Sequence, residues 1–114
     1  MDDPILVVLS NFPDQASAER AAHALLGART VACVNIHPAV KSCYHWNGKL
    51  EEAMEIPLSA KTTAQRYRQV EEILRHQHPY ELPEIIALPV THGLPAYLQW
   101  VQTETAEPSH PIVA

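Results

Sequence analysis

The sequence WNGK, residues 46–49, decides how this chain folds, because Asn-Gly is the strongest short signal for a β-hairpin. Both residues tolerate the positive φ angles that a type I′ turn requires. The β-rich residues 30–46 lead into the turn, and residues 49–61 are the predicted return strand. Pro38 and Pro57 interrupt the two strands, so each is expected at a bulge or beside an open edge.

Strands and helices are predicted on both sides of this hairpin. Residues 5–9, ILVVL, form a continuous apolar run, which is typical of a strand covered on both faces. Apolar residues at helical spacing predict the helices, with Asp14 and Thr63 as candidate N-caps. The predicted elements outside the hairpin are strands at 5–9 and 85–90 and helices at 15–28, from Thr63 to just before Pro79, and at 95–105.

The order of these elements is strand, helix, strand, strand, helix, strand and a further helix. This βαββαβ order predicts an α+β fold of the ferredoxin-like, split βαβ type, with an appended C-terminal helix. A chain of 114 residues is long enough for one hydrophobic core, so we expect a single domain over residues 1–114. Its core is expected at residues 5–105, and residues 106–114 are expected to form a loosely held tail.

Composition and charge make nucleic-acid and membrane partners unexpected. The formal net charge is −5 at pH 7 and no cluster of Lys and Arg is present, so the basic surface of a nucleic-acid binder is missing. No apolar stretch approaches the roughly 20 residues of a membrane span, and the first residues lack the pattern of a signal peptide. We expect a cytoplasmic protein.

No catalytic motif is visible in the sequence. The motifs G-x-S-x-G and H-E-x-x-H and a Gly-rich phosphate loop are all absent, so we do not expect an enzyme. The histidine content is high, with seven His among 114 residues. Metal binding is therefore the chemistry that the sequence favours.

One group of candidate metal ligands lies in and just before the segment HPYELPEIIALPV, residues 78–90. His76 and His78 lie at the end of the second predicted helix, where the helix dipole favours a cation. Glu81 and Glu84 follow, and the prolines of the segment hold the chain extended around them. The same features also fit a purely structural role, in which a stiff connector fixes how the helix leads into the last strand.

A second candidate group lies in the outgoing strand of the hairpin. Cys43 and His45 point to the same face of that strand, about 6.6 Å apart along the backbone, which suits a shared soft cation. A structural role, in which they fill one face of the hairpin, fits them as well. Tyr44 and Trp46 beside them would be exposed in a monomer, so we expect an oligomer that covers them.

Several ordered motifs make the chain similar to one protein family. Over residues 5 to about 104 it resembles the CutA divalent-cation tolerance proteins. The matching motifs are ACVNI at 32–36 with Pro38, Y-x-W-x-G-K at 44–49, Lys61-Thr62, H-P-Y-E-x-P-E-I-I-A-L-P at 78–89 and P-x-Y-L-x-W at 95–100.

The resemblance implies a ferredoxin-like subunit in a tight homotrimer, with long hairpin arms that pair across subunits and clefts that lie between them. The family is associated with tolerance of divalent metals, copper especially. Our leading interpretation is therefore a non-enzymatic, cytoplasmic homotrimer linked to the response to divalent metals. The candidate cleft residues are Lys61, Tyr80, Trp46, Tyr44 and Glu81.

The copper ligands of this family match the chain only in part. In bacterial members a Cys at the end of the first strand and a His-His pair before Pro-Tyr have been treated as ligands. Ser10 stands at the Cys position here, and the pair is Gln77-His78. With His76 as a substitute and Glu84 nearby, the candidate set is imidazole and carboxylate. Such a set suits Cu(II) or Zn(II) and gives no reason to expect tight Cu(I) binding.

An alternative from another functional class is a small-molecule sensor. The trimeric PII signalling proteins share the fold that the resemblance implies, and they bind effectors in clefts between subunits. The expected partners are therefore further copies of the same chain and either a metal ion or a small-molecule ligand.

Overall fold

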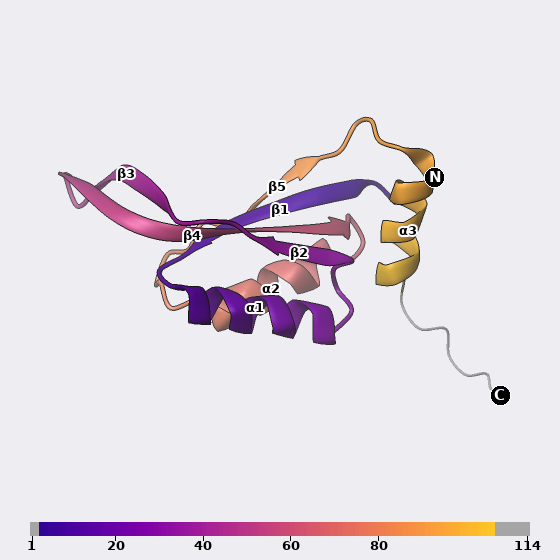
Figure 1. Cartoon of the computed structure of the whole chain (residues 1–114), viewed down its shortest axis with the longest axis horizontal. Helices are drawn as coiled ribbons and strands as arrows, with labels where there is room; N and C mark the ends of the chain where they lie inside the picture. Colours follow the sequence, from indigo (N-terminus) through magenta and orange to yellow (C-terminus); the bar gives the residue numbers. More distant parts are fainter. Residues whose placement is uncertain (1–2, 107–114) are drawn as a thin grey trace.

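The computed structural model describes residues 3–106, which form five strands and three helices (Figure 1). In chain order these are β1 (Ile5–Phe12), α1 (Gln15–Gly27), β2 (Cys33–Ile36), β3 (Val40–Trp46), β4 (Lys49–Thr63), α2 (Tyr67–Gln77), β5 (Ile86–Pro89) and α3 (Pro95–Thr105). Residues 107–114 of the expected tail lie outside the described residues.

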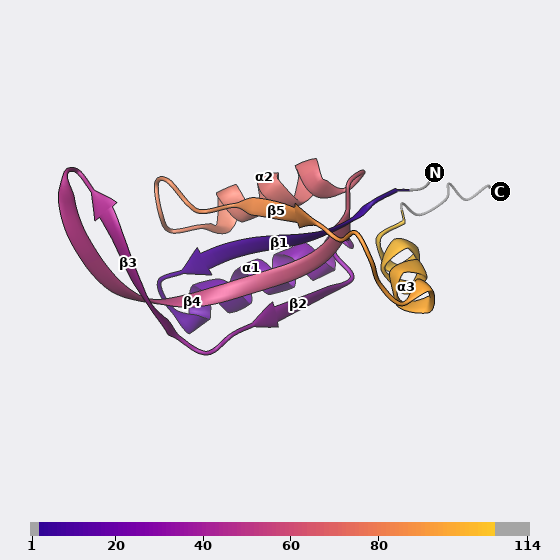
Figure 2. The same cartoon turned by 90° about the horizontal axis from the view of Figure 1, so that it is seen from above.

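The strands form an antiparallel sheet in the order β2-β4-β1-β5, and β3 pairs with the part of β4 that extends beyond this sheet. α1 and α2 lie side by side on one face of the sheet, and Figure 2 looks onto the other face. In the sheet, Val8 of β1 lies opposite Ala60 of β4 and Ala87 of β5. This is the predicted split βαβ arrangement, with α3 appended at one end of the sheet.

The hydrophobic core lies between the sheet and the two helices. Its fully buried side chains include Phe12 of β1, Leu25 of α1 and Leu74 of α2. Along most of β1 a buried residue alternates with a half-buried one. Within residues 3–106 of one subunit no helix lies over most of the second face, so the predicted cover on both faces is not found within the subunit (Figure 2).

The predicted strand over residues 30–46 is interrupted at residues 37–39 and forms β2 and β3. The N–H of His37 donates to the carbonyl of Pro57 across this break, at 2.9 Å. In an antiparallel strand the N–H and C=O of one residue point to the same side, so the missing N–H of Pro57 faces the break. Pro38 lies in the break itself, whereas Pro57 lies within β4, paired with Asn11, and turns its donor-free nitrogen toward the break. The element order is consequently βαβββαβα.

β4 continues to Thr63, past the predicted end at residue 61, and the second helix begins later than predicted. Thr63, the predicted N-cap of that helix, is the last residue of β4 and pairs with Ile5. Pairing with β1 extends the strand, and α2 has no side-chain hydrogen bond at its N-cap. Asp14 caps α1 as predicted, because its Oδ1 accepts a hydrogen bond from the N–H of Ser17 at 2.8 Å.

An arm, residues 40–55, projects from the body of the molecule (Figure 2). The turn at its tip has positive φ angles at Asn47 (52°) and Gly48 (77°), which confirms the type I′ prediction. The described chain measures 56 × 30 × 23 Å and has a radius of gyration of 15.6 Å. A compact chain of this length has a radius of gyration of about 13 Å. The arm therefore carries much of its surface away from the rest of the subunit.

α3 lies beside one end of the sheet (Figure 2). Its Tyr97 hydroxyl lies 3.8 Å from Sγ of Cys33, and the side chain of Gln102 donates to the backbone carbonyl of Asp3. Cys33 and Cys43 are both free thiols. No helix within residues 3–106 has the length and hydropathy that crossing a lipid bilayer requires.

Candidate functional site

A cavity of about 630 Å³, which we call the arm pocket, lies between the arm and the connector, residues 78–85. The pocket is lined by side chains from β1, the arm and the connector. The residues that matter most for its chemistry are Tyr44, Trp46, Glu55, Tyr80, Glu81 and Glu84. The structure thus gathers all of the predicted cleft residues except Lys61, together with the candidate ligands Cys43 and Glu84.

Strand pairing decides which arm side chains face the pocket. Alternate residues of a strand point to the same face, so Ser42, Tyr44 and Trp46 share one face of β3. Val40 lies on that face and pairs with Glu55, which places Glu55 there as well. Glu55 is only 8% exposed. Glu55 is absent from the predicted site residues, although counting outward from the Asn-Gly turn predicts its pairing with Val40.

Tyr80 joins the connector to the arm. Its hydroxyl donates a hydrogen bond to Oε2 of Glu55 at 2.8 Å. Burial, followed by this hydrogen bond, raises the pKa of Tyr80 far above its ordinary value. The hydroxyl therefore stays protonated at neutral pH and remains a donor that links the two walls of the pocket.

The connector is fastened to β1 by two side chains. The buried hydroxyl of Ser10 donates to the backbone carbonyl of Glu84 at 2.7 Å. The amide of Asn11 donates to Oε1 of Glu84 at 3.1 Å. Ser10, which stands where the resemblance implies a Cys ligand, therefore has a structural contact in this chain.

His78 lies at the start of the connector and points into the core. α2 ends at Gln77, and His78 is extended before Pro79, as predicted. His78 is 8% exposed, and its ring centroid lies 4.1 Å from that of Phe12. Its Nδ1 accepts a hydrogen bond from the N–H of Tyr80 at 3.3 Å, and its Nε2 is buried. Burial lowers the pKa of His78, so the ring is neutral at pH 7.

The predicted metal ligands do not converge in one subunit. His76 is exposed in the last turn of α2, His78 is buried, and Glu84 faces the arm pocket. Across residues 3–106, no three His, Cys, Asp or Glu side chains are grouped closely enough to hold a metal ion. A metal site built from the predicted set would therefore need rearrangement or a second subunit.

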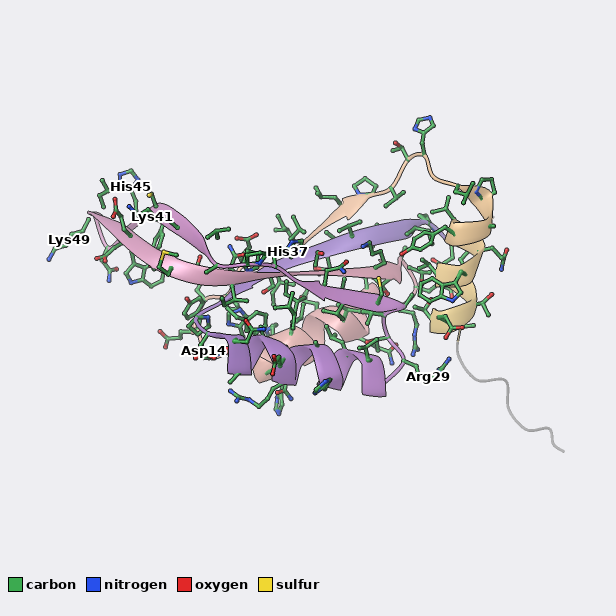
Figure 3. All side chains as sticks on the ribbon, in the orientation of Figure 1. Asp14, Arg29, His37, Lys41, His45 and Lys49 are labelled. Carbon is green, nitrogen blue, oxygen red and sulfur yellow. The ribbon has the colours of Figure 1, made fainter. Side chains whose placement is uncertain are left out.

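The second candidate pair lies on the arm. The Sγ of Cys43 lies 4.0 Å from Oε2 of Glu52, on the neighbouring strand. His45 is exposed near the tip of the arm (Figure 3). Lys61, by contrast, lies in the sheet, where its Nζ donates to Oδ1 of Asn35 at 2.9 Å.

The electrostatic character of the arm pocket is acidic and aromatic. Three glutamates line it, and no Lys or Arg is among the described residues around it. Tyr44, Trp46 and Tyr80 supply aromatic surface. Carboxylates and aromatic ring faces both attract cations, so positively charged ligands are favoured here.

The fold and the site define an α+β protein with an antiparallel sheet, a projecting hairpin arm and an acidic, aromatic pocket beside that arm. The sequence model of the family described as CutA1 divalent ion tolerance protein matches residues 6–104. The chain belongs to this family.

Individual relatives agree with this assignment. The divalent-cation tolerance protein CutA of Escherichia coli (strain K12 / DH10B) is 41% identical over 96 residues, which cover 84% of this chain and 86% of that protein. The solved divalent cation tolerance protein Cut A1 of Thermus thermophilus is 40% identical and has a TM-score of 0.86, covering 89% of this chain and 98% of its own. The periplasmic divalent cation tolerance protein CutA of Archaeoglobus fulgidus is 33% identical, with a TM-score of 0.85 over 89% and 98% of the two chains.

Proposed function

We propose that this protein is a non-enzymatic homotrimer that takes part in the tolerance of divalent metal ions, copper among them. Family membership and the names of the relatives support the link to divalent metals. The observation that supports the proposed homotrimer is the apolar surface that is exposed to solvent on a single subunit. A cytoplasmic location is part of the proposal, whereas the Archaeoglobus fulgidus relative is described as periplasmic.

The helix-free face of the sheet supplies the first part of that surface. Ile86 and Leu88 of β5 are 48% and 51% exposed, and they lie beside Leu9 and Val7 of β1 in the sheet. An apolar sheet face that helices do not cover is a typical subunit contact. Three subunits that turn these faces toward a common axis would remove them from water.

The arm supplies the second part. Leu50 and Met54 are 70% and 59% exposed and lie on the arm face turned away from the arm pocket. Trp46, at the tip, is 47% exposed. A neighbouring subunit that accepts the arm would cover these side chains, which supports the proposed pairing of arms across subunits.

Light scattering after gel filtration tests the assembly, and we expect three times the 12.7 kDa mass of one chain. Leu88→Lys should lower the mass, because a charge cannot be buried at an apolar contact without a partner. The matched control is Leu26→Lys, since Leu26 is 41% exposed at the end of α1, on the other face. A monomeric wild type would contradict the proposal. If Leu88→Lys and Leu26→Lys have equal masses, β5 does not lie in the subunit contact.

For metal binding, the proposed ligands are His76, His78 and Glu84, with Cu(II) or Zn(II) as the ion. His76 is exposed, but Nε2 of His78 is buried, so His78 can ligate only after its ring leaves Phe12. We therefore expect weak binding, because part of the binding free energy is spent on breaking that stack.

Calorimetric titration of Cu(II) into the wild type and into His76→Ala, His78→Ala and Glu84→Gln tests this set. Each variant should lower the affinity, whereas the control His92→Ala, in the exposed loop before α3, should not. Equal affinity in all of them shifts the proposal to Cys43 and His45, where Cys43→Ser then becomes the deciding variant.

A second candidate function is that of a PII-like sensor that binds a small effector. The observation that favours it is the arm pocket, whose volume of about 630 Å³ lies within the range of small-molecule sites, about 300–1,000 Å³. A thermal-shift screen of metals, nucleotides, small anions and small cations distinguishes the two functions, because a ligand that binds only the folded state raises its melting temperature.

A further inference from the structure

The buried carboxylate of Glu55 has no positive partner within residues 3–106. Only 8% of this residue is exposed, and the Tyr80 hydroxyl is the donor that reaches its Oε2. Its Oε1 accepts no hydrogen bond from the described residues, and the ion pairs Arg29–Glu104 and Lys41–Glu52 do not involve it. A buried carboxylate without a compensating charge is costly, so a cation that reaches it gains a strong interaction.

The imidazole of the connector does not occupy this site. The ring of His78 stacks on Phe12, its Nδ1 accepts the N–H of Tyr80, and the residue does not line the arm pocket. The carboxylate of Glu55 therefore stays open to a ligand that enters the pocket.

The other walls of the pocket suit an organic cation rather than a bare metal ion. Tyr44 and Trp46 are 40% and 47% exposed on the arm face, and Tyr80 adds a third ring. Aromatic faces attract cations and also shield alkyl groups from water. A metal ion needs several ligands at short distance, and the described residues hold no group of three.

We propose that the arm pocket binds a primary alkylammonium cation, with the ammonium group donating to Glu55 and the alkyl chain lying against Tyr44 and Trp46. Glu81 and Glu84 also line the pocket, so a diamine has a carboxylate for each end. This inference names a ligand class for the sensor candidate above and rests on it.

The same ammonium chemistry has two possible sources, a free amine and a lysine of a neighbouring subunit. We assign the pocket to the free amine, because its volume of about 630 Å³ exceeds what one lysine side chain fills. Replacing Lys49, near the tip of the arm (Figure 3), tests whether a lysine of a neighbouring subunit fills the pocket instead.

The direct test is calorimetric titration of the assembled protein with putrescine, a four-carbon diamine, at low ionic strength. The neutral probe of similar length is 1,4-butanediol, which should give no binding. Glu55→Gln keeps the shape and an acceptor for Tyr80 but removes the charge, and it should weaken putrescine binding by about tenfold or more. The matched control is Glu52→Gln, on the same strand but on the opposite face, where Glu52 pairs with Lys41 at 3.5 Å.

Several outcomes overturn the proposal. These are equal putrescine affinity in the wild type and Glu55→Gln, equal binding of the diol, or no binding at all. Putrescine could also bind only after Lys49 is replaced by Ala, and that binding could then be lost in the double variant Lys49→Ala/Glu55→Gln. This result would show that Lys49 fills the pocket in the wild type, and it would overturn the free-amine assignment. If Glu55→Gln does not fold, Tyr44→Leu decides, because it keeps every carboxylate and should weaken putrescine binding several-fold. The control is His92→Leu, in the exposed loop before α3.

Failure of this site and failure of the proposed function are distinguishable. The same preparations are measured by light scattering and titrated with Cu(II). A trimer that binds Cu(II) but not putrescine overturns the amine site alone. A monomer that binds putrescine overturns the homotrimer and leaves the amine site in place.

Discussion

The imidazole of His78 stacks on the ring of Phe12, with centroids 4.1 Å apart and planes inclined by 19°. This contact joins the end of α2 to the end of β1, two elements far apart in sequence. The same imidazole accepts the N–H of Tyr80, so it also orients the first residues of the connector. A ring in this position must stay neutral, because protonation would remove the acceptor and place a charge in the core.

The first prediction concerns pH. Burial lowers the pKa of His78 below its ordinary value of 6.5, so the unfolded chain holds the proton more tightly than the native one. Stability should be fully present above about pH 6.5 and should fall as the pH drops from there through the lowered native pKa. His78→Asn, whose Oδ1 can take the place of Nδ1, should flatten the dependence of the melting temperature on pH between about 7 and 5.

The control for this prediction is His76→Asn. His76 is exposed at the end of α2, so this variant should keep the slope of the wild type. Identical slopes in all three proteins would mean that another group governs the acid sensitivity.

The second prediction concerns the fastening of the connector. Ser10→Ala removes the donor to the Glu84 carbonyl and should lower the free energy of unfolding by about 1 kcal/mol in urea denaturation. Amide hydrogen exchange in residues 80–85 should become faster, because the connector loses one of its two ties to β1. Ser42→Ala, in the half-buried part of the arm, is the control and should change neither quantity. Unchanged exchange in Ser10→Ala would show that Asn11 holds the connector without help.

The third prediction compares two neighbouring leucines of α1. Leu25 is fully buried and Leu26 is 41% exposed. Leu25→Ala should cost about 2–5 kcal/mol, because it loses burial and leaves a cavity between the helix and the sheet. Leu26→Ala should cost about 1 kcal/mol or less. Denaturation at one fixed protein concentration gives both values, and similar costs would indicate that Leu26 is buried in the assembled protein.

The fourth prediction concerns the tip of the arm. Trp46→Ala should weaken the trimer by about tenfold or more, because large aromatic side chains dominate interface energies. His23→Ala, exposed on α1 and outside the arm, should have a much smaller effect. Sedimentation of a dilution series measures the dissociation of each variant. If Trp46→Ala dissociates at the wild-type concentration, the tip does not belong to the subunit contact.

Local patterns predicted most of the fold. The Asn-Gly turn, the Asp14 cap and the third helix, residues 95–105, all appear in the structure where the sequence placed them. The break between β2 and β3 was missed, because Pro38 marks an irregular residue but does not reveal that the strand resumes on the arm. The extension of β4 to Thr63 was also missed, because pairing with Ile5 sets that boundary and pairing partners are not visible in one segment.

The candidate site was predicted where its residues lie near each other in sequence. Tyr80, Glu81 and Glu84 share the connector, and all of them line the arm pocket. Glu55 was missed because, although the turn fixes its pairing with Val40, nothing in the sequence shows which arm face turns toward the connector. The inward orientation of His78 could not be predicted either, since it depends on Phe12, which the fold brings beside it.

β4 runs without a break from the sheet into the arm, so the number of residues in the arm strands controls how far the arm extends. The 15 residues of β4 have a contour length of roughly 50 Å, so the reach of the arm beyond the sheet depends on how many residues the arm contains. Removing two residues from each arm strand would shorten the arm by about 7 Å and keep every remaining side chain on its own face. Removing one from each would exchange the faces beyond the cut, bringing His45 inward and turning Tyr44 and Trp46 outward. The reach of the arm can therefore change only in steps of two residues if its surface is to keep the same pattern.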